Sequence, residues 1–165
     1  MSLRIILLAG AAVAIGIHQA ENSQLLNRIL HPIDGAYGYE LGRSYDISDL
    51  EADGFKLTSL PRNVNKSLTK NLTDDPIVRR IRLFLDKDND LTDIELRSKM
   101  DRPCKEYVNI FTGIIEKKYP ELAEQAVAEY GNAREIRSGD RWISTGIPMQ
   151  ESTCLGAYMI YSEEP

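Results

Sequence analysis

Residues 78–97 read VRRIRLFLDKDNDLTDIELR, and they carry the strongest structural signal in the chain. Apolar and polar residues alternate on both sides of a polar tip at residues 87–90. A tight turn at the middle of this tip places Leu83 opposite Ile94 on a neighbouring strand. The same register places four apolar residues on one face and an opposite-charge pair on the other, so we predict a β-hairpin.

The predicted register also separates a core face from a surface face. Ile81 pairs with Leu96 on the apolar face, beside the Leu83–Ile94 pair. Arg82 lies opposite Glu95 on the other face, where we expect both charged side chains to be at least partly exposed.

The rest of the chain predicts short elements on both sides of the hairpin. Before it, we expect strands at 37–42 and 55–60, a helical turn at 46–50 and an exposed loop at 61–76. After it, we expect a helix with an apolar stripe from Cys104 to Ile115 that is broken at Tyr119-Pro120, a second helix at 121–130, and then strands at 141–147 and 154–161. Because strands precede and follow a helical pair, the predicted fold class is α+β. We expect an antiparallel sheet including a central hairpin, with the helical pair packed on one face, behind an N-terminal leader helix.

Residues 1–20 have the pattern of a leader. Arg4 precedes an apolar run over residues 5–17, as in a secretory signal peptide. A membrane-spanning helix usually needs ~20 apolar residues. A cleaved signal, a retained anchor formed by residues 3–17 and a buried core helix remain the alternatives. Residues 21–165 are predicted to form a single domain, exported to a bacterial periplasm or cell surface or anchored to the membrane.

Composition limits the partners of this domain. The chain has 165 residues, a formal net charge of −5 and 42% hydrophobic residues, which suits one folded domain. An acidic balance argues against general binding to nucleic acid, which needs a basic footprint. We therefore predict no nucleic-acid partner, and membrane contact only through residues 3–17 if the leader is retained.

The two cysteines, Cys104 and Cys154, predict a disulfide bond. An even number of cysteines in an exported protein usually forms a disulfide framework. Two unpaired core cysteines, or a catalytic thiol, are the alternatives. Two cysteines and His31 do not match a zinc-site spacing.

No sequence pattern identifies catalytic residues, a metal site or a cofactor. The acidic stretch 86–90 resembles the start of a calcium-binding loop, but Leu91 replaces the required Gly and Arg97 replaces the bidentate Glu. Sequence signatures of common hydrolases and nucleotide-binding loops are absent. We therefore expect no metal ion and no cofactor.

Basic residues gather between positions 56 and 82. Such a patch in an acidic protein is able to bind an anion or an acidic partner. The alternative is a solvated loop whose arginines pair with nearby acids. The candidate patch consists of Lys56, Arg62, Arg80 and Arg82.

The run AYGYELGRSYD at residues 36–46 resembles the opening of small uncharacterised bacterial exported proteins, whose mature domain starts with an aromatic-Gly-x-x-Leu-Gly strand. The order of a hairpin, a helix that starts near a Cys and a second Cys on a late strand is also similar. The resemblance implies export and an α+β domain, and it carries no known activity. The sequence favours a non-enzymatic envelope protein that binds a partner protein or small ligand, or helps assembly. A small hydrolase or an enzyme-inhibitor-like module is the alternative, and whether the chain is an enzyme stays open.

Overall fold

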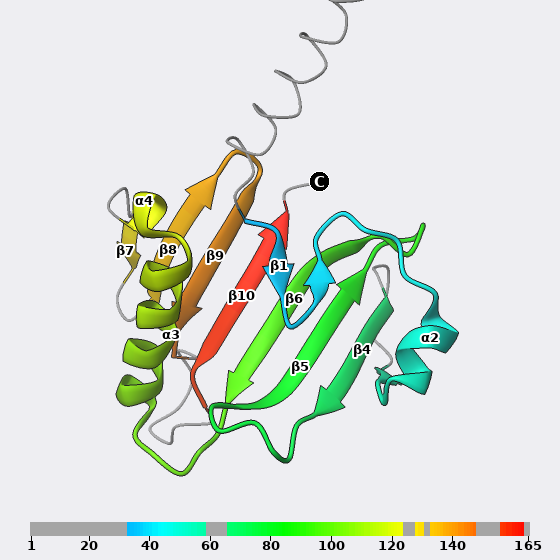
Figure 1. The fold of residues 1–165 in the computed structure, drawn as a ribbon, viewed down its shortest axis with the longest axis horizontal. Coiled ribbons are helices and arrows are strands. Elements are labelled where there is room, and N and C mark those ends of the chain that lie inside the picture. Colours follow the sequence, from blue (N-terminus) through cyan, green and yellow to red (C-terminus); the bar gives the residue numbers. More distant parts are fainter. Residues whose placement is uncertain (1–32, 59–65, 124–127, 131–132, 148–155, 164–165) are drawn as a thin grey trace, which may run out of the picture. The chain divides into compact units, whose positions relative to one another are not determined.

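A computed structural model describes residues 33–58, 66–123, 128–130, 133–147 and 156–163 of the chain. Residues 33–165 form one compact unit (Figure 1). The predicted leader, residues 1–20, lies outside the described residues. Of the helices in the described part, none is both long enough and apolar enough to cross a membrane.

The unit is an antiparallel sheet with a few helices, so the predicted α+β class is confirmed. A two-stranded sheet is formed by β1 (Gly35–Ala36) and β2 (Tyr39–Glu40). An eight-stranded sheet has the order β3-β4-β5-β6-β10-β9-β8-β7. Its strands are β3 (Lys56–Thr58), β4 (Lys66–Asn71), β5 (Val78–Leu85), β6 (Leu91–Ser98), β7 (Ala128–Tyr130), β8 (Ala133–Ser138), β9 (Arg141–Gly146) and β10 (Tyr158–Glu163). The helices are α2 (Ile47–Ala52), α3 (Cys104–Lys118) and α4 (Pro120–Ala123).

The predicted hairpin is confirmed as β5 and β6, in the predicted register. Leu83 pairs with Ile94, Ile81 with Leu96, and Arg82 with Glu95. The register shifts at both ends of the pairing, between Val78 and Arg80 and between Phe84 and Leu85, the second being close to the tip. The last strand, β10, is inserted between β6 and β9.

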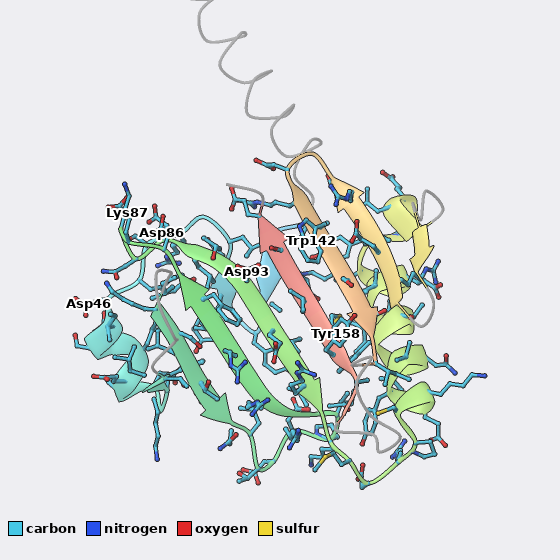
Figure 2. All side chains as sticks on the ribbon, turned by 180° about the vertical axis from the view of Figure 1, so that it is seen from behind. Asp46, Asp86, Lys87, Asp93, Trp142 and Tyr158 are labelled. Carbon is cyan, nitrogen blue, oxygen red and sulfur yellow. The ribbon has the colours of Figure 1, made fainter. Side chains whose placement is uncertain are left out.

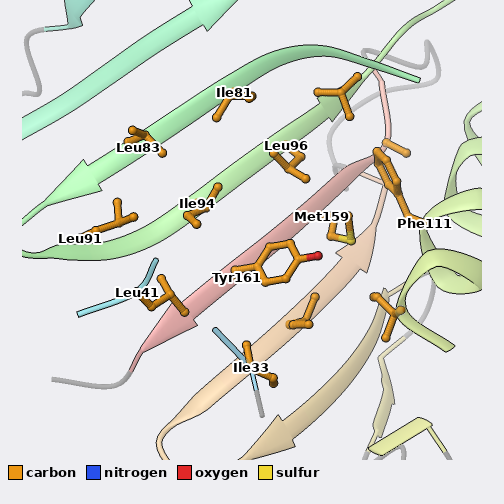
Figure 3. Close-up of a cluster of buried hydrophobic side chains, with 14 of the residues drawn as sticks. Ile33, Leu41, Ile81, Leu83, Leu91, Ile94, Leu96, Phe111, Met159 and Tyr161 are labelled. Carbon is orange, nitrogen blue, oxygen red and sulfur yellow. The ribbon is translucent and has the colours of Figure 1, made fainter. Parts of the chain in front are cut away.

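The core lies on one face of the large sheet (Figure 3). Aliphatic side chains of the central strands project from this face, and α3 adds Tyr107, Phe111 and Ile115 to them. The segment from Ile33 to Phe55 contributes to the same cluster. The buried strand residues of this core are Leu68, Val78, Ile81, Leu83, Leu85, Leu91, Ile94, Leu96, Ile136, Ile143, Met159 and Tyr161.

The predicted exposed loop at 61–76 is wrong for residues 66–71, which form β4. This strand pairs with β3 on one side and β5 on the other. Leu68 is the one aliphatic residue of β4, and its side chain is buried in the core. One aliphatic residue is too few to show an alternating pattern in the sequence. Backbone hydrogen bonds to β3 and β5 keep β4 in the sheet.

The predicted helix at 121–130 is also wrong in its second half. The helix α4 ends at Ala123, and residues 128–130 form β7, which pairs with β8. The β8 strand was not predicted, because Ile136 is its one buried aliphatic residue. Pairing with β9 on its other side places β8 within the sheet.

The predicted strand at 37–42 is a tight hairpin instead. Tyr37 and Gly38 both have positive φ values, 55° and 84°. Two successive residues of this kind form the turn that suits a two-residue β-hairpin. The alternating tyrosines therefore lie around a turn between β1 and β2 and not along one strand.

Candidate partner-binding surface

The face of the large sheet opposite the core, here called the open face, is seen in Figure 2. In this view the strands β4, β5, β6, β10 and β9 face the reader, α3 lies partly behind the sheet, and α2 lies beside its β4 edge. None of the described helices covers the open face. The side chains that project from it alternate along each strand with the buried core residues.

The open face is polar with interspersed aromatic side chains. Trp142 and Tyr158 are half-buried and lie on this face (Figure 2). Phe84 and Ile160 are also half-buried, in the same alternation on β5 and β10. Asp93 accepts a hydrogen bond from Ser162. A sheet face with this mixture of aromatic and polar groups is typical of surfaces that bind other proteins.

The structure brings together three of the four residues of the predicted basic patch. Lys56 pairs with Thr69, which pairs with Arg82, so these side chains share one row across β3, β4 and β5. Arg80 lies next to this row on the same face of β5. Arg62 lies outside the described residues.

Arg97 belongs to the same surface, although the predicted patch did not include it. It lies directly opposite Arg80 in the pairing of β5 with β6. The hairpin register could have revealed this, because the rule that pairs Arg82 with Glu95 also pairs Arg80 with Arg97. We refer to Arg80, Arg82 and Arg97 as the arginine cluster.

Glu95 lies within the arginine cluster, and it is buried, so the prediction that it is partly exposed is wrong. Its residue exposure is 7%. Arg97 Nε and Nη2 donate to the two carboxylate oxygens of Glu95 at 2.7 and 3.3 Å. Arg82 Nη1 lies 3.9 Å from the same carboxylate. The two guanidinium groups cover the carboxylate and compensate its charge.

Arg80 differs from the other two arginines. Its guanidinium has no hydrogen-bond acceptor and no ion-pair partner among the residues that the structure describes, and its Nε is buried. Burial lowers the pKa of Arg80, and the positive charge of Arg82 lowers it further. The arginine cluster therefore holds three positive charges against the single carboxylate of Glu95, whose charge also acts on Arg80 without a direct ion pair among the described residues.

Aromatic rings support two of the guanidinium groups. The guanidinium carbon of Arg97 is 5.6 Å from the centre of the Tyr158 ring, and that of Arg82 is 5.9 Å from the Phe84 ring. Cation–π contacts of this length restrict the orientation of an arginine. Arg82 and Arg97 are therefore held by aromatic rings as well as by Glu95.

The predicted disulfide involves Cys104, which is buried at the first position of α3. Cys154 lies outside the described residues, so the pairing stays a prediction.

The acidic tip of the hairpin forms a turn. Asp86 Oδ1 accepts hydrogen bonds from the backbone N–H groups of Asp88 and Asp90, at 2.8 and 2.9 Å. Asn89 has a φ of 68°, and its side chain accepts a hydrogen bond from Lys66. Within the described residues, no three His, Cys, Asp or Glu side chains group as metal ligands.

Tyrosine–aspartate hydrogen bonds tie the N-terminal segment to the rest of the unit. Tyr37 donates to Asp75 at 2.8 Å, and Tyr39 donates to Asp53. Asp75 also accepts from the backbone N–H groups of Ile77 and Val78, at 2.8 and 2.6 Å. Burial opposes ionisation of Asp75, but these hydrogen bonds hold its pKa below the usual value.

Comparison of the chain with protein-family models, with curated proteins and with solved structures gives no match. The function is therefore inferred from the open face and its arginine cluster.

Proposed function

We propose that this protein is a non-enzymatic binding module that holds an acidic segment of a partner protein on the open face of its sheet. The observation that carries the proposal is Arg80, a half-buried arginine on that face without an acceptor among the described residues. A partly desolvated guanidinium costs free energy unless an acceptor compensates it. A carboxylate from a partner supplies the missing acceptor.

The charges favour an acidic protein over other anionic partners. Nucleic acid and anionic membranes are bound by extended basic surfaces, whereas this chain has a net charge of −5. The arginine cluster is local, and Glu95 already compensates part of it. Tyr158 and Trp142 add the aromatic groups that are enriched in protein–protein interfaces.

The proposal includes the setting predicted from the sequence. Residues 1–20 direct export, as a cleaved signal peptide or as a retained anchor, and the partner is an envelope protein. The helices α3 and α4 pack as a pair on the core face, so the opposite face stays available. The resemblance of residues 36–46 to bacterial exported proteins agrees with this setting.

A binding titration with a defined probe tests the proposal. The full-length protein, purified in mild detergent, is titrated against a fluorescent glutamate-rich peptide and, separately, a lysine-rich peptide of equal length. We expect saturable binding of the glutamate-rich peptide alone, weakened by about tenfold or more in Arg80→Glu. Arg43→Glu is the matched control, because Arg43 is exposed and its side chain pairs with Glu40 away from the cluster.

The control variant should bind within about twofold of the wild type, since a distant exposed charge is screened by salt. Equal loss in both variants would indicate a general charge effect and would contradict the proposed surface. Binding of the lysine-rich peptide with equal affinity would contradict the acidic partner.

A further inference from the structure

The row of the open face that contains Arg80 and Arg97 has an unusual composition. The two arginines are direct cross-strand partners on β5 and β6, and Tyr158 on β10 is the next residue in the row. Like charges directly opposite each other destabilise a sheet, and side chains in such a pair lie close together. Two guanidinium groups are therefore held next to each other at a cost to the fold.

Arg97 is oriented by its own neighbours. Its Nε and Nη2 groups donate hydrogen bonds to Glu95. Its guanidinium carbon lies 5.6 Å from the centre of the Tyr158 ring. Its Nη1 group has no acceptor among the described side chains and backbone. Arg97 thus keeps one terminal nitrogen without an acceptor among the described residues, and Arg80 lies opposite Arg97 in the pairing of β5 with β6.

Arg80 provides the second set of donors. Its Nε is buried, whereas its two terminal nitrogens are neither buried nor bonded to any described residue. The buried Nε restricts the side chain, and the terminal N–H groups reach the solvent. Two arginines with free N–H groups on one row can together surround a single oxyanion.

We propose that Arg80 and Arg97 jointly bind one carboxylate group of the acidic partner segment, with Arg97 positioned by Glu95 and Tyr158. This inference rests on the proposed function, because it names the chemical group that the open face takes. A carboxylate matches the planar guanidinium fork, as the Arg97–Glu95 pair on the same strand already shows.

Lysine substitution separates this site from a general charge effect, since lysine keeps the charge and loses the planar fork. The full-length protein and its variants Arg80→Lys, Arg97→Lys and Arg43→Lys are titrated with the glutamate-rich peptide. We expect Arg80→Lys and Arg97→Lys each to weaken binding by roughly tenfold. Arg43→Lys is the matched control and should stay within about twofold of the wild type, because Arg43 is exposed and pairs with Glu40 away from the cluster. Thermal unfolding of each variant shows that it remains folded.

The outcomes distinguish the site from the broader function. Wild-type affinity in Arg80→Lys, together with loss in Arg80→Glu, would overturn the two-arginine site and leave the acidic-partner function in place. Wild-type affinity in both would overturn the site and the function. Competition with acetate and with inorganic phosphate tests the carboxylate directly, because displacement of the peptide by phosphate at far lower concentration than acetate would overturn the assignment.

Discussion

Glu95 and Arg97, two residues apart on β6, form a two-point ion pair on the open face of the sheet, with N–O distances of 2.7 and 3.3 Å. Both residues of the pair belong to β6, and Arg82 on the neighbouring strand β5 lies 3.9 Å from the Glu95 carboxylate. The carboxylate of Glu95 is therefore occupied by ion pairs within the protein. Its role is to hold Arg97 and to reduce repulsion within the arginine cluster.

Replacing Glu95 with Gln should lower the free energy of unfolding by about 1–3 kcal/mol, because three arginines then face each other without a carboxylate. Chemical denaturation measures the change. Glu40→Gln is the control, because the Glu40–Arg43 pair is exposed and 3.9 Å long, and its loss should cost at most ~0.5 kcal/mol. Equal effects of the two substitutions would show that Glu95 does not organise the cluster.

Replacing Arg80 with Gln should leave the free energy of unfolding unchanged or raise it by up to about 1 kcal/mol, because it removes a like-charge cross-strand pair. Arg97→Gln should instead lower it, since Glu95 then loses its two-point partner. Denaturation of the two variants under the same conditions makes the comparison. A larger loss of stability in Arg80→Gln than in Arg97→Gln would mean that Arg80 has a structural role.

Stability should fall at acidic pH through Asp75. Its pKa is lower in the folded protein than in the unfolded chain, so the unfolded chain takes up the proton first as the pH falls. The stabilisation is complete above the unfolded pKa, near the usual value of 3.8, and is lost as the pH falls through the lowered folded pKa. Asp75→Asn should be less stable at neutral pH and less sensitive to acid over this range. A pH dependence identical to that of the wild type would exclude Asp75 as a contributor.

Cys104 and Cys154 should form a disulfide bond in the exported protein. Thiol titration of denatured, unreduced protein should then detect no free thiol, and reduction should release two. Substituting both cysteines with Ser should lower stability by about 2–5 kcal/mol. Detection of two free thiols in protein isolated under non-reducing conditions would reject the bond.

The hairpin could be predicted because three independent signals agree in residues 78–97. The polar tip, the alternation and the Arg82–Glu95 pair all specify one register. By contrast, β4 and β8 each bury a single aliphatic residue, Leu68 and Ile136, so their alternation carries little signal. Their place in the sheet depends on backbone hydrogen bonds to neighbouring strands, which leave no trace in the side-chain pattern.

The candidate surface could be predicted in part. Grouping basic residues by sequence distance found Lys56, Arg80 and Arg82, which share the open face. It missed Arg97, which is distant in sequence and adjacent across the hairpin. The burial of Glu95 depends on the side chains that cover it, and a two-strand register does not contain that information.

The most direct test of the acidic-partner surface is a map of backbone amide shifts by nuclear magnetic resonance, as the glutamate-rich peptide is added to the labelled full-length protein. We predict saturable shifts at residues 80–84, 93–97 and 158–162, on the three strands that carry the arginine cluster and Tyr158. Residues of α3 and of the hairpin tip should not shift. Saturable shifts centred on α3, or no saturable shift at the arginine cluster, would contradict the account.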